Sequence, residues 1–119
     1  TPLSWAAEKG QLEIVKLLLV NNADSNSTDS QGRTPLSWAA DKGESEIVKL
    51  LLKKNAKPDL SDRNGRTPLS WAAEKGHPEI VKLLLVNNAD SNSTDSQGRT
   101  PLSWAAERGH ESVVNVLIE

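Results

Sequence analysis

Four tryptophans are the side chains best suited to hold another molecule, because each is followed four residues later by a cation. They are the only aromatic residues of the 119-residue chain, and they recur every 33 residues. If this segment is helical, Trp38 and Lys42 lie about 40° apart around the helix, on the face opposite Leu36 and Ala40. The four pairs are Trp5 and Lys9, Trp38 and Lys42, Trp71 and Lys75, and Trp104 and Arg108.

Two interpretations of this pattern stay open at the level of sequence. In the first, the tryptophans and their cations form an exposed column that grips a partner. In the second, each tryptophan packs sideways against the next structural unit and the stem of the cationic side chain lies over its ring.

A second group of candidates lies in polar segments, where packing does not dictate the residue type. The segment Asp29-Ser30-Gln31-Gly32 suits a type I turn, and similar turns begin at Asp62 and Asp95. We expect side chains at these turn tips to project, and three arginines among them to form a ladder that favours acidic protein segments. The alternative is that these loops are merely solvated. The candidates are Ser30, Gln31, Arg33, Arg63, Asn64, Arg66, Ser96, Gln97 and Arg99.

Other kinds of chemistry find little support in the chain. His77 and His110 occupy matching positions but have no third ligand at that spacing and no cysteine nearby, so we predict no metal site and no cofactor. No catalytic constellation or phosphate-binding loop is present, which predicts a protein that is not an enzyme. The net charge is −2 and the basic residues alternate with acidic ones, which argues against nucleic acid. No apolar run approaches the length of a membrane span.

The elements that must position these side chains follow from a repeated heptapeptide, Thr-Pro-Leu-Ser-Trp-Ala-Ala. A threonine followed by proline starts a helix, and Gly43 stands where a left-handed cap ends one, so each first helix is short. Residues 44–52 are mostly apolar and predict a second helix that is buried on several sides, with Lys49 facing solvent. The heptapeptide begins at Thr1, Thr34, Thr67 and Thr100.

The same residues resemble the ankyrin repeat. The resemblance rests on the Thr-Pro-Leu opening, the double alanine, Gly43, the Ile47-Val48 pair, the Leu51-Leu52 pair and the Asn55-Ala56 tail, and it extends over the whole chain. The amino-acid sequence of the heptapeptide is also similar to ankyrin arrays of fungal NLR-like proteins, a resemblance that is less specific. Serine replaces the histidine of the family motif, and we expect this serine to hydrogen-bond within its own helix.

The resemblance implies an all-α solenoid of helix-turn-helix units with projecting β-turn or hairpin loops. We expect one array over 1–119, with repeats at 1–33, 34–66, 67–99 and a shorter one at 100–119. It further implies a non-catalytic module that binds a partner protein through its concave groove and turn tips, in an intracellular, cytoplasmic setting. A larger recognition or signalling protein would contain it.

Neither terminal unit has a polar outer face, so a second function stays open. The array could serve as a structural spacer or a self-stacking solenoid that binds no ligand directly. We expect partial exposure at both ends, and end-to-end self-association at high concentration. The residues concerned are Leu3, Leu17, Leu18, Val113, Val116, Leu117 and Ile118.

Overall fold

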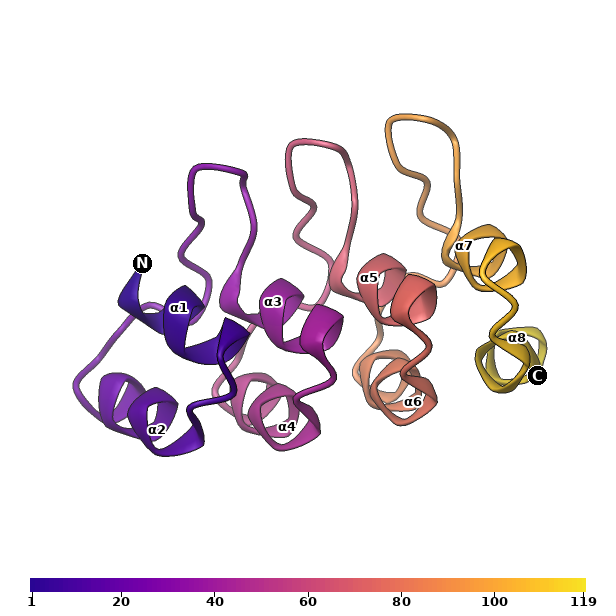
Figure 1. The fold of residues 1–119 in the computed structure, drawn as a ribbon. Helices are drawn as coiled ribbons and strands as arrows, with labels where there is room; N and C mark the ends of the chain where they lie inside the picture. The colour runs from indigo at the N-terminus through magenta and orange to yellow at the C-terminus, as the bar shows by residue number, and fades with distance from the viewer.

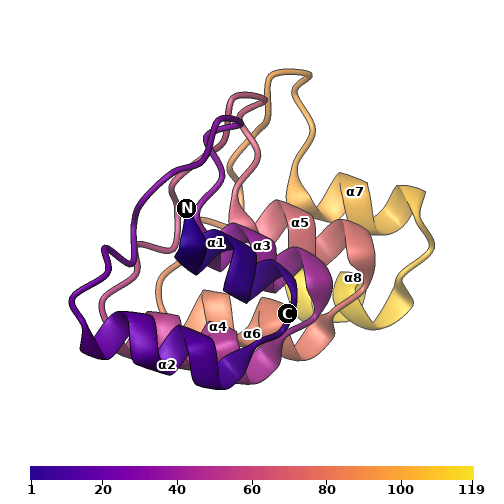
Figure 2. The same cartoon turned by 60° about the vertical axis from the view of Figure 1, so that its left-hand side comes forward.

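The computed structural model describes residues 1–119 as four stacked pairs of antiparallel helices (Figure 1). The first helices of the pairs lie side by side in one layer and the second helices form the other layer, while three loops project on the same side (Figures 1 and 2). The two termini lie at opposite ends of the stack. The elements are α1 (Pro2–Glu8), α2 (Leu12–Val20), α3 (Pro35–Lys42), α4 (Ser45–Lys53), α5 (Pro68–Lys75), α6 (Pro78–Val86), α7 (Pro101–Glu107) and α8 (Glu111–Ile118).

The first helices begin as the sequence predicts, and α3 and α5 also end at the predicted glycine, whereas α1 and α7 end one residue earlier. In α3, Thr34 Oγ1 accepts a hydrogen bond from the Ser37 backbone N–H at 3.1 Å, and proline occupies the first turn. Gly43 ends this eight-residue helix in the left-handed conformation, at φ 77° and ψ 24°. The predicted second helix over 44–52 is α4, displaced by one residue to Ser45–Lys53.

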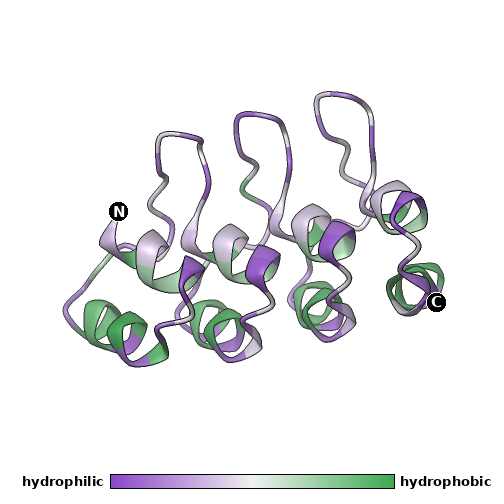
Figure 3. Cartoon of the chain, viewed as in Figure 1, coloured by the Kyte–Doolittle hydropathy of each residue, from purple (hydrophilic) through white to green (hydrophobic).

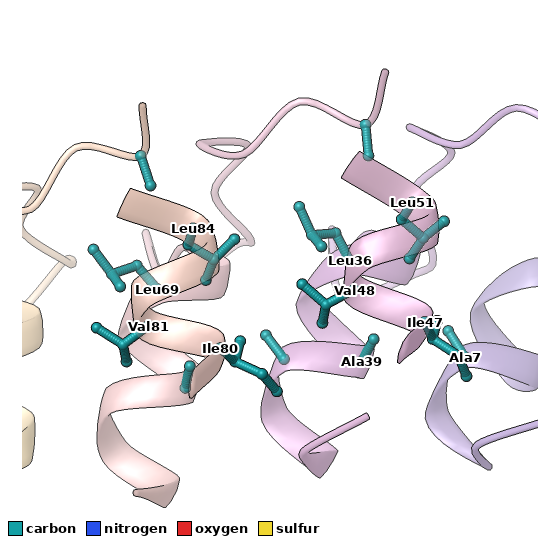
Figure 4. Close-up of a cluster of buried hydrophobic side chains, with 14 of the residues drawn as sticks. Ala7, Leu36, Ala39, Ile47, Val48, Leu51, Leu69, Ile80, Val81 and Leu84 are labelled. Atoms are coloured by element: carbon teal, nitrogen blue, oxygen red, sulfur yellow. The ribbon is translucent and has the colours of Figure 1, made fainter. Parts of the chain in front are cut away.

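The core runs along the stack between the two helix layers. Ala39 and Ala40 of α3 are fully buried, and their small size lets α4 approach closely. Ile47 of α4 points toward Ala7 of the preceding helix pair (Figure 4), so the second helices also bind neighbouring units together. Apolar residues accordingly concentrate in the second helices and polar residues in the loops (Figure 3). Lys49 is exposed, as expected.

The terminal helix pairs differ from the prediction in part. Leu3 and Val113 are buried, because each faces the inside of its own helix pair and the adjoining unit, so their expected exposure is wrong. Leu17 and Ile118 are exposed at 58% and 64%. The remaining three, Leu18, Val116 and Leu117, are half-buried.

The projecting loops are tight turns joined to each other by backbone hydrogen bonds. In the first, the Gly32 N–H donates to the Asp29 carbonyl at 2.9 Å, which closes the turn. The Arg63 N–H then donates to the Gln31 carbonyl at 3.1 Å, across to the next loop. No residue of the chain is in a β-strand, and none of the eight helices combines the length and apolar character needed to cross a membrane.

Candidate functional site

One aspartate organises each projecting loop and connects it to a tryptophan. Asp29 Oδ1 accepts hydrogen bonds from the backbone N–H groups of Gln31 and Arg33, both at 2.9 Å. Its other oxygen, Oδ2, accepts the indole N–H of Trp38 at 2.8 Å. The same indole bonds join Trp71 to Asp62 and Trp104 to Asp95, each at 3.1 Å. The loop and the first helix that follows it are therefore held as one rigid piece.

In two of the loops, these hydrogen bonds stabilise the charged form of the aspartate, Asp29 or Asp95. Burial alone would raise the pKa of Asp29, but the bonds from the Trp38 indole and from the Arg33 and Gln31 backbone outweigh it and lower the pKa below its usual value. The pKa of Asp95 is lowered in the same way, with burial opposed by bonds from the Arg99 backbone and the Trp104 indole.

The predicted arginine ladder at the turn tips is wrong for two of its three members. Arg33 and Arg66 are only 5% and 8% exposed. The Arg33 guanidinium carbon lies 3.7 Å from the centre of the Trp38 ring and 4.0 Å from that of Trp71, so the cation is sandwiched between two repeats. Aromatic faces attract a cation, and this attraction directs the side chain inward along the stack.

Arg66 repeats the arrangement between Trp71 and Trp104, at 3.7 and 4.0 Å. Arg99 covers the Trp104 ring at 4.4 Å and is half-buried. Arginines and tryptophans therefore alternate along the groove side of the stack, in the order Trp38, Arg33, Trp71, Arg66, Trp104 and Arg99.

Each buried arginine is also neutralised by polar partners. Arg33 donates through Nε to Ser37 Oγ at 3.0 Å and through Nη2 to Asp41 Oδ2 at 3.0 Å. Burial lowers the pKa of Arg33, while the bond to Asp41 opposes that change. Ser37 Oγ thus accepts a bond from the guanidinium of Arg33, and the predicted bond within its own helix is not found.

Ser70 accepts from Arg66 Nε in the same way, at 3.1 Å. Ser103 instead follows the prediction and donates to the Thr100 carbonyl at 2.8 Å.

The acidic residue near the end of each first helix connects cations of two repeats. Asp41 lies 3.0 Å from Arg33 and, through its other oxygen, 3.0 Å from Lys75 of the next repeat. Glu74 likewise lies 2.8 Å from Arg66 and 3.0 Å from Arg108. Arg99 pairs with Glu107 at 2.9 Å in a more exposed setting. The cations of the groove are therefore largely matched by carboxylates of the chain itself.

The tryptophans do not form a uniformly exposed column. Trp5 is 65% exposed, Trp38 and Trp71 are half-buried, and Trp104 is only 8% exposed. The rings of Trp38, Trp71 and Trp104 are packed sideways, as the second interpretation has it, but the cation close over each ring is a turn arginine and not the one four residues later. Lys75 and Arg108 lie farther off, at 5.8 and 5.9 Å from the rings of Trp71 and Trp104.

The other predicted candidates lie at the surface. Lys9, Lys42, Lys75 and Arg108 are exposed along the ends of the first helices. The loop residues that project into solvent are Ser30, Gln31, Arg63, Asn64, Ser96 and Gln97.

Three open pockets lie in series on this side of the stack. The first, of about 400 Å³, includes Trp5, Glu8 and Trp38 in its lining. The second, of about 350 Å³, lies between the loops of Gln31 and Asn64. The third, of about 240 Å³, lies between the loops of Asn64 and Gln97.

His77 and His110 connect consecutive repeats. His77 Nε2 lies 3.0 Å from the carbonyl oxygen of Asp41, and His110 Nε2 lies 2.7 Å from that of Glu74. Both carbonyls belong to the last turn of a first helix, where helix geometry provides no partner. The histidines therefore supply a missing hydrogen bond between repeats.

Sequence reasoning missed the aspartate anchors and the partners of the arginines. The signal was present, because the order Asp29, Arg33, Trp38, Asp41 recurs 33 residues later as Asp, Arg, Trp, Glu. A buried cation needs a carboxylate and an aromatic face, and both stand at a constant distance from each arginine.

Comparison with known proteins agrees with this architecture. A family model described as "Ankyrin repeats (3 copies)" matches residues 1–62 and again 54–119. A comparison with curated proteins found no significant match. Because the two family matches together span the whole sequence, the chain belongs to the ankyrin-repeat family.

Proposed function

We propose that this array binds an extended segment of a partner protein along the turn tips and the pockets between them. Ankyrin repeats are generally protein–protein interaction modules and are typically non-enzymatic. The observation that carries the finer proposal is a series of three pockets beside the loops, the first between α1 and the first loop and the other two between neighbouring loops. An extended peptide presents side chains at regular intervals, which suits such a series.

The residues at the turn tips favour recognition of a partner over a surface that is only solvated. Gln31 and Asn64 each line two of the pockets, yet they differ in type at matching positions of neighbouring repeats. Their backbone is fixed by the hydrogen bonds between loops, so the exposed side chains are presented on a rigid support. A partner would therefore meet a preformed surface.

The preference for acidic segments that the arginine ladder suggested loses its basis. Arg33 and Arg66 are buried and paired with carboxylates, so neither is free to meet an acidic partner. The exposed cations of this face, Lys42 and Arg63 among them, are interspersed with Glu8 and Asp62. We therefore propose a partner of mixed polar character.

A peptide-display selection against the array tests this proposal. The selected peptides are measured against the unchanged chain, against a tip variant with Gln31, Asn64 and Gln97 replaced by alanine, and against a control with Lys16, Lys49 and Lys82 replaced by alanine on the second helices. We expect the tip variant to bind about tenfold or more weakly and the control to bind normally. The opposite ranking of the two variants would reject the groove as the binding surface.

Self-stacking is the second candidate function, and one observation favours it. Exposed apolar side chains occur at both ends of the stack, with Ile14 and Leu17 at one end and Leu102 and Ile118 at the other. We expect reversible association at high protein concentration, reduced by Leu17→Glu. A strict monomer in sedimentation experiments at millimolar concentration would exclude this candidate.

An intracellular location is proposed on the family resemblance alone. Asn26 and Asn92 both stand in Asn-Ser-Thr sequences that secretory cells could glycosylate. The mass of the protein purified from its natural source provides the test, because attached glycans at either site would contradict this location.

A further inference from the structure

We propose that the two pockets between neighbouring loops each bind the carboxamide side chain of a glutamine or asparagine of the partner. The proposal rests on the function proposed above and deepens it, because it names the chemistry of the groups that these two pockets take. It is carried by one nitrogen on each of the two buried arginines, Arg33 and Arg66, that makes no hydrogen bond within the chain.

The free nitrogen is Nη1 in both arginines. Arg33 donates through Nε and Nη2 to Ser37 and Asp41, so this edge of its guanidinium faces α3 and Nη1 lies on the other edge. Each fully buried side-chain nitrogen of the protein has a hydrogen-bond partner, so Nη1, which has none, reaches solvent. Arg66 is in the same state, with Nε and Nη2 bound to Ser70 and Nη1 free.

The pockets between the loops are where these nitrogens meet solvent. Arg33 lines the pocket of about 350 Å³ and Arg66 lines that of about 240 Å³, although the two residues are only 5% and 8% exposed. Aromatic rings on both sides hold each guanidinium in place. Each pocket therefore has a fixed N–H donor in its wall.

A hydrogen-bond acceptor belongs to the wall of each pocket as well. Asp62 lines the larger pocket, and its Oδ2 accepts a single hydrogen bond, from the Trp71 indole. A carboxylate oxygen can accept two, so one place is left on this atom. Asp95 of the smaller pocket is in the same state, with Trp104 as the donor. Both pockets thus offer one free donor and one free acceptor.

This combination favours a carboxamide over charged side chains. The oxygen of a carboxamide accepts a hydrogen bond from Nη1, and its NH₂ group donates one to the aspartate. A carboxylate offers acceptors only and would lie beside Asp62 or Asp95, which carry the same charge. An ammonium group offers donors only and would lie beside an arginine. Asp41 and Glu74 already pair with the two arginines, so little uncompensated positive charge remains to attract a carboxylate.

One extended segment can fill both pockets. The guanidinium carbons of Arg33 and Arg66 lie 4.0 and 3.7 Å from the centre of the same Trp71 ring, so the two donors are close neighbours. Alternate side chains of an extended peptide point to one side and are about 6–7 Å apart. Two carboxamides separated by one residue therefore suit the pair of pockets.

The test compares defined peptides. Acetyl-Thr-Gln-Thr-Gln-Thr-amide is titrated into the chain, and the indole signals of Trp71 and Trp104 are followed by proton–nitrogen NMR. Matched peptides carry glutamate or methionine in place of both glutamines. We expect saturable shifts with the glutamine peptide and about tenfold weaker binding of the other two. The indole of Trp5, which lines neither pocket, should not shift.

Two results of this comparison would overturn the proposal. Equal or tighter binding of the glutamate peptide would show that positive charge, not the paired donor and acceptor, determines recognition. Equal binding of the methionine peptide would show that the main chain of the peptide is bound and that its carboxamides are not.

An exposed cation at the larger pocket provides a further check. Arg63 lines this pocket, whereas the matching residue of the smaller pocket is Ser96. Arg63→Ser removes a charge that attracts glutamate, so it should raise the preference for glutamine over glutamate at the Trp71 signal. A preference that fell instead would assign the recognition to Arg63 and reject the role of Arg33.

A variant of the buried donor locates the site. Arg66→Lys keeps a positive charge beside Glu74 and lacks Nη1, so the Trp104 signal should lose its preference for glutamine over glutamate. Lys82→Ala, on a second helix, is the control and should bind normally. Circular dichroism checks that both variants fold, and an unchanged preference in folded Arg66→Lys would overturn the proposal. If this variant does not fold, the peptide comparison on the unchanged chain decides.

The result can be separated from that of the peptide selection. Selected peptides that bind at the turn tips but contain neither glutamine nor asparagine would refute the carboxamide proposal and leave the proposed function intact. Saturable binding of the glutamine peptide in the absence of any selected peptide would have the opposite meaning.

Discussion

The indole of Trp38 and the carboxylate of Asp29 lie nine residues apart in the sequence and are joined by a hydrogen bond of 2.8 Å. Because Asp29 also accepts two backbone N–H groups of its own turn, this single side chain links the loop to the following helix. The three loops share the design, so the projecting side of the molecule depends on three aspartates.

Replacing this anchor should therefore lower stability. We expect Asp29→Ala to reduce the free energy of unfolding by about 2 kcal/mol, since two turn N–H groups and one indole N–H lose their acceptor. Urea unfolding followed by circular dichroism measures the change. Glu13→Ala, which removes an exposed ion pair with Lys16, is the control and should cost well under about 1 kcal/mol. Equal losses of unfolding free energy in the two variants would refute the role of Asp29 as an anchor of the loop.

The lowered pKa values of Asp29 and Asp95 predict sensitivity to acid. A carboxylate whose pKa is lower in the folded chain stabilises the fold above its unfolded pKa, and this contribution is lost as pH falls through the folded value. The usual value is 3.8, so the loss should begin near pH 4 and continue below it. Melting temperatures between pH 6 and pH 2 should decline less steeply in the Asp29→Asn, Asp95→Asn double variant. If melting temperature declined with pH as steeply in the double variant as in the unchanged chain, the lowered pKa values of the two aspartates would be contradicted.

Two arginines of the ladder differ in burial, so we expect their removal to lower the free energy of unfolding by different amounts. Arg33→Ala leaves Asp41 buried with only Lys75 as partner and removes a cation from between two rings, so we expect a loss of about 3 kcal/mol. Arg99→Ala affects a pair that is 37% and 50% exposed, and should cost about 1 kcal/mol or less. Chemical denaturation measures the free energy of unfolding of both variants. Similar losses would argue against a stabilising position of Arg33 between the two rings.

Two glycines have the same backbone conformation but different surroundings, so replacing each by alanine distinguishes the cost of backbone strain from the cost of a steric clash. Gly65 and Gly98 have φ values of +75° and +78°, so alanine is strained at either position. A Cβ at residue 65 would lie 3.0 Å from the Ser96 backbone nitrogen, whereas none of the surrounding atoms lies within 4 Å of a Cβ at residue 98. Gly65→Ala should therefore be less stable than Gly98→Ala by about 1 kcal/mol in paired denaturation curves. Equal stability would show that the loops can separate without penalty.

The fold could be predicted from sequence because its determinants are local. Thr34 and Pro35 start a helix, Gly43 ends it, and the spacing of Leu36 and Ala40 defines its apolar face. Each of these features acts within one turn of helix. Repetition at a constant interval then leaves little choice of how the units stack.

The site was predicted less well because it depends on contacts between repeats. Arg33 stands in a polar turn, where a cation is usually solvated, and only the ring of Trp71 in the following repeat explains its burial. The same applies to His77, whose partner is a backbone carbonyl of the preceding repeat and has no signature in side-chain types. Exposure of the loop residues, by contrast, followed from their polarity and position.

The position of Arg33 between rings of two repeats bears on how the chain unfolds. If the repeat with Trp71 unfolded alone, the guanidinium of Arg33 would lose one of its two aromatic faces, and Asp41 would lose Lys75. That penalty couples each unit energetically to the next, which raises the nearest-neighbour term of a linear array relative to the intrinsic stability of its units. The two inner repeats should therefore melt in a single cooperative transition.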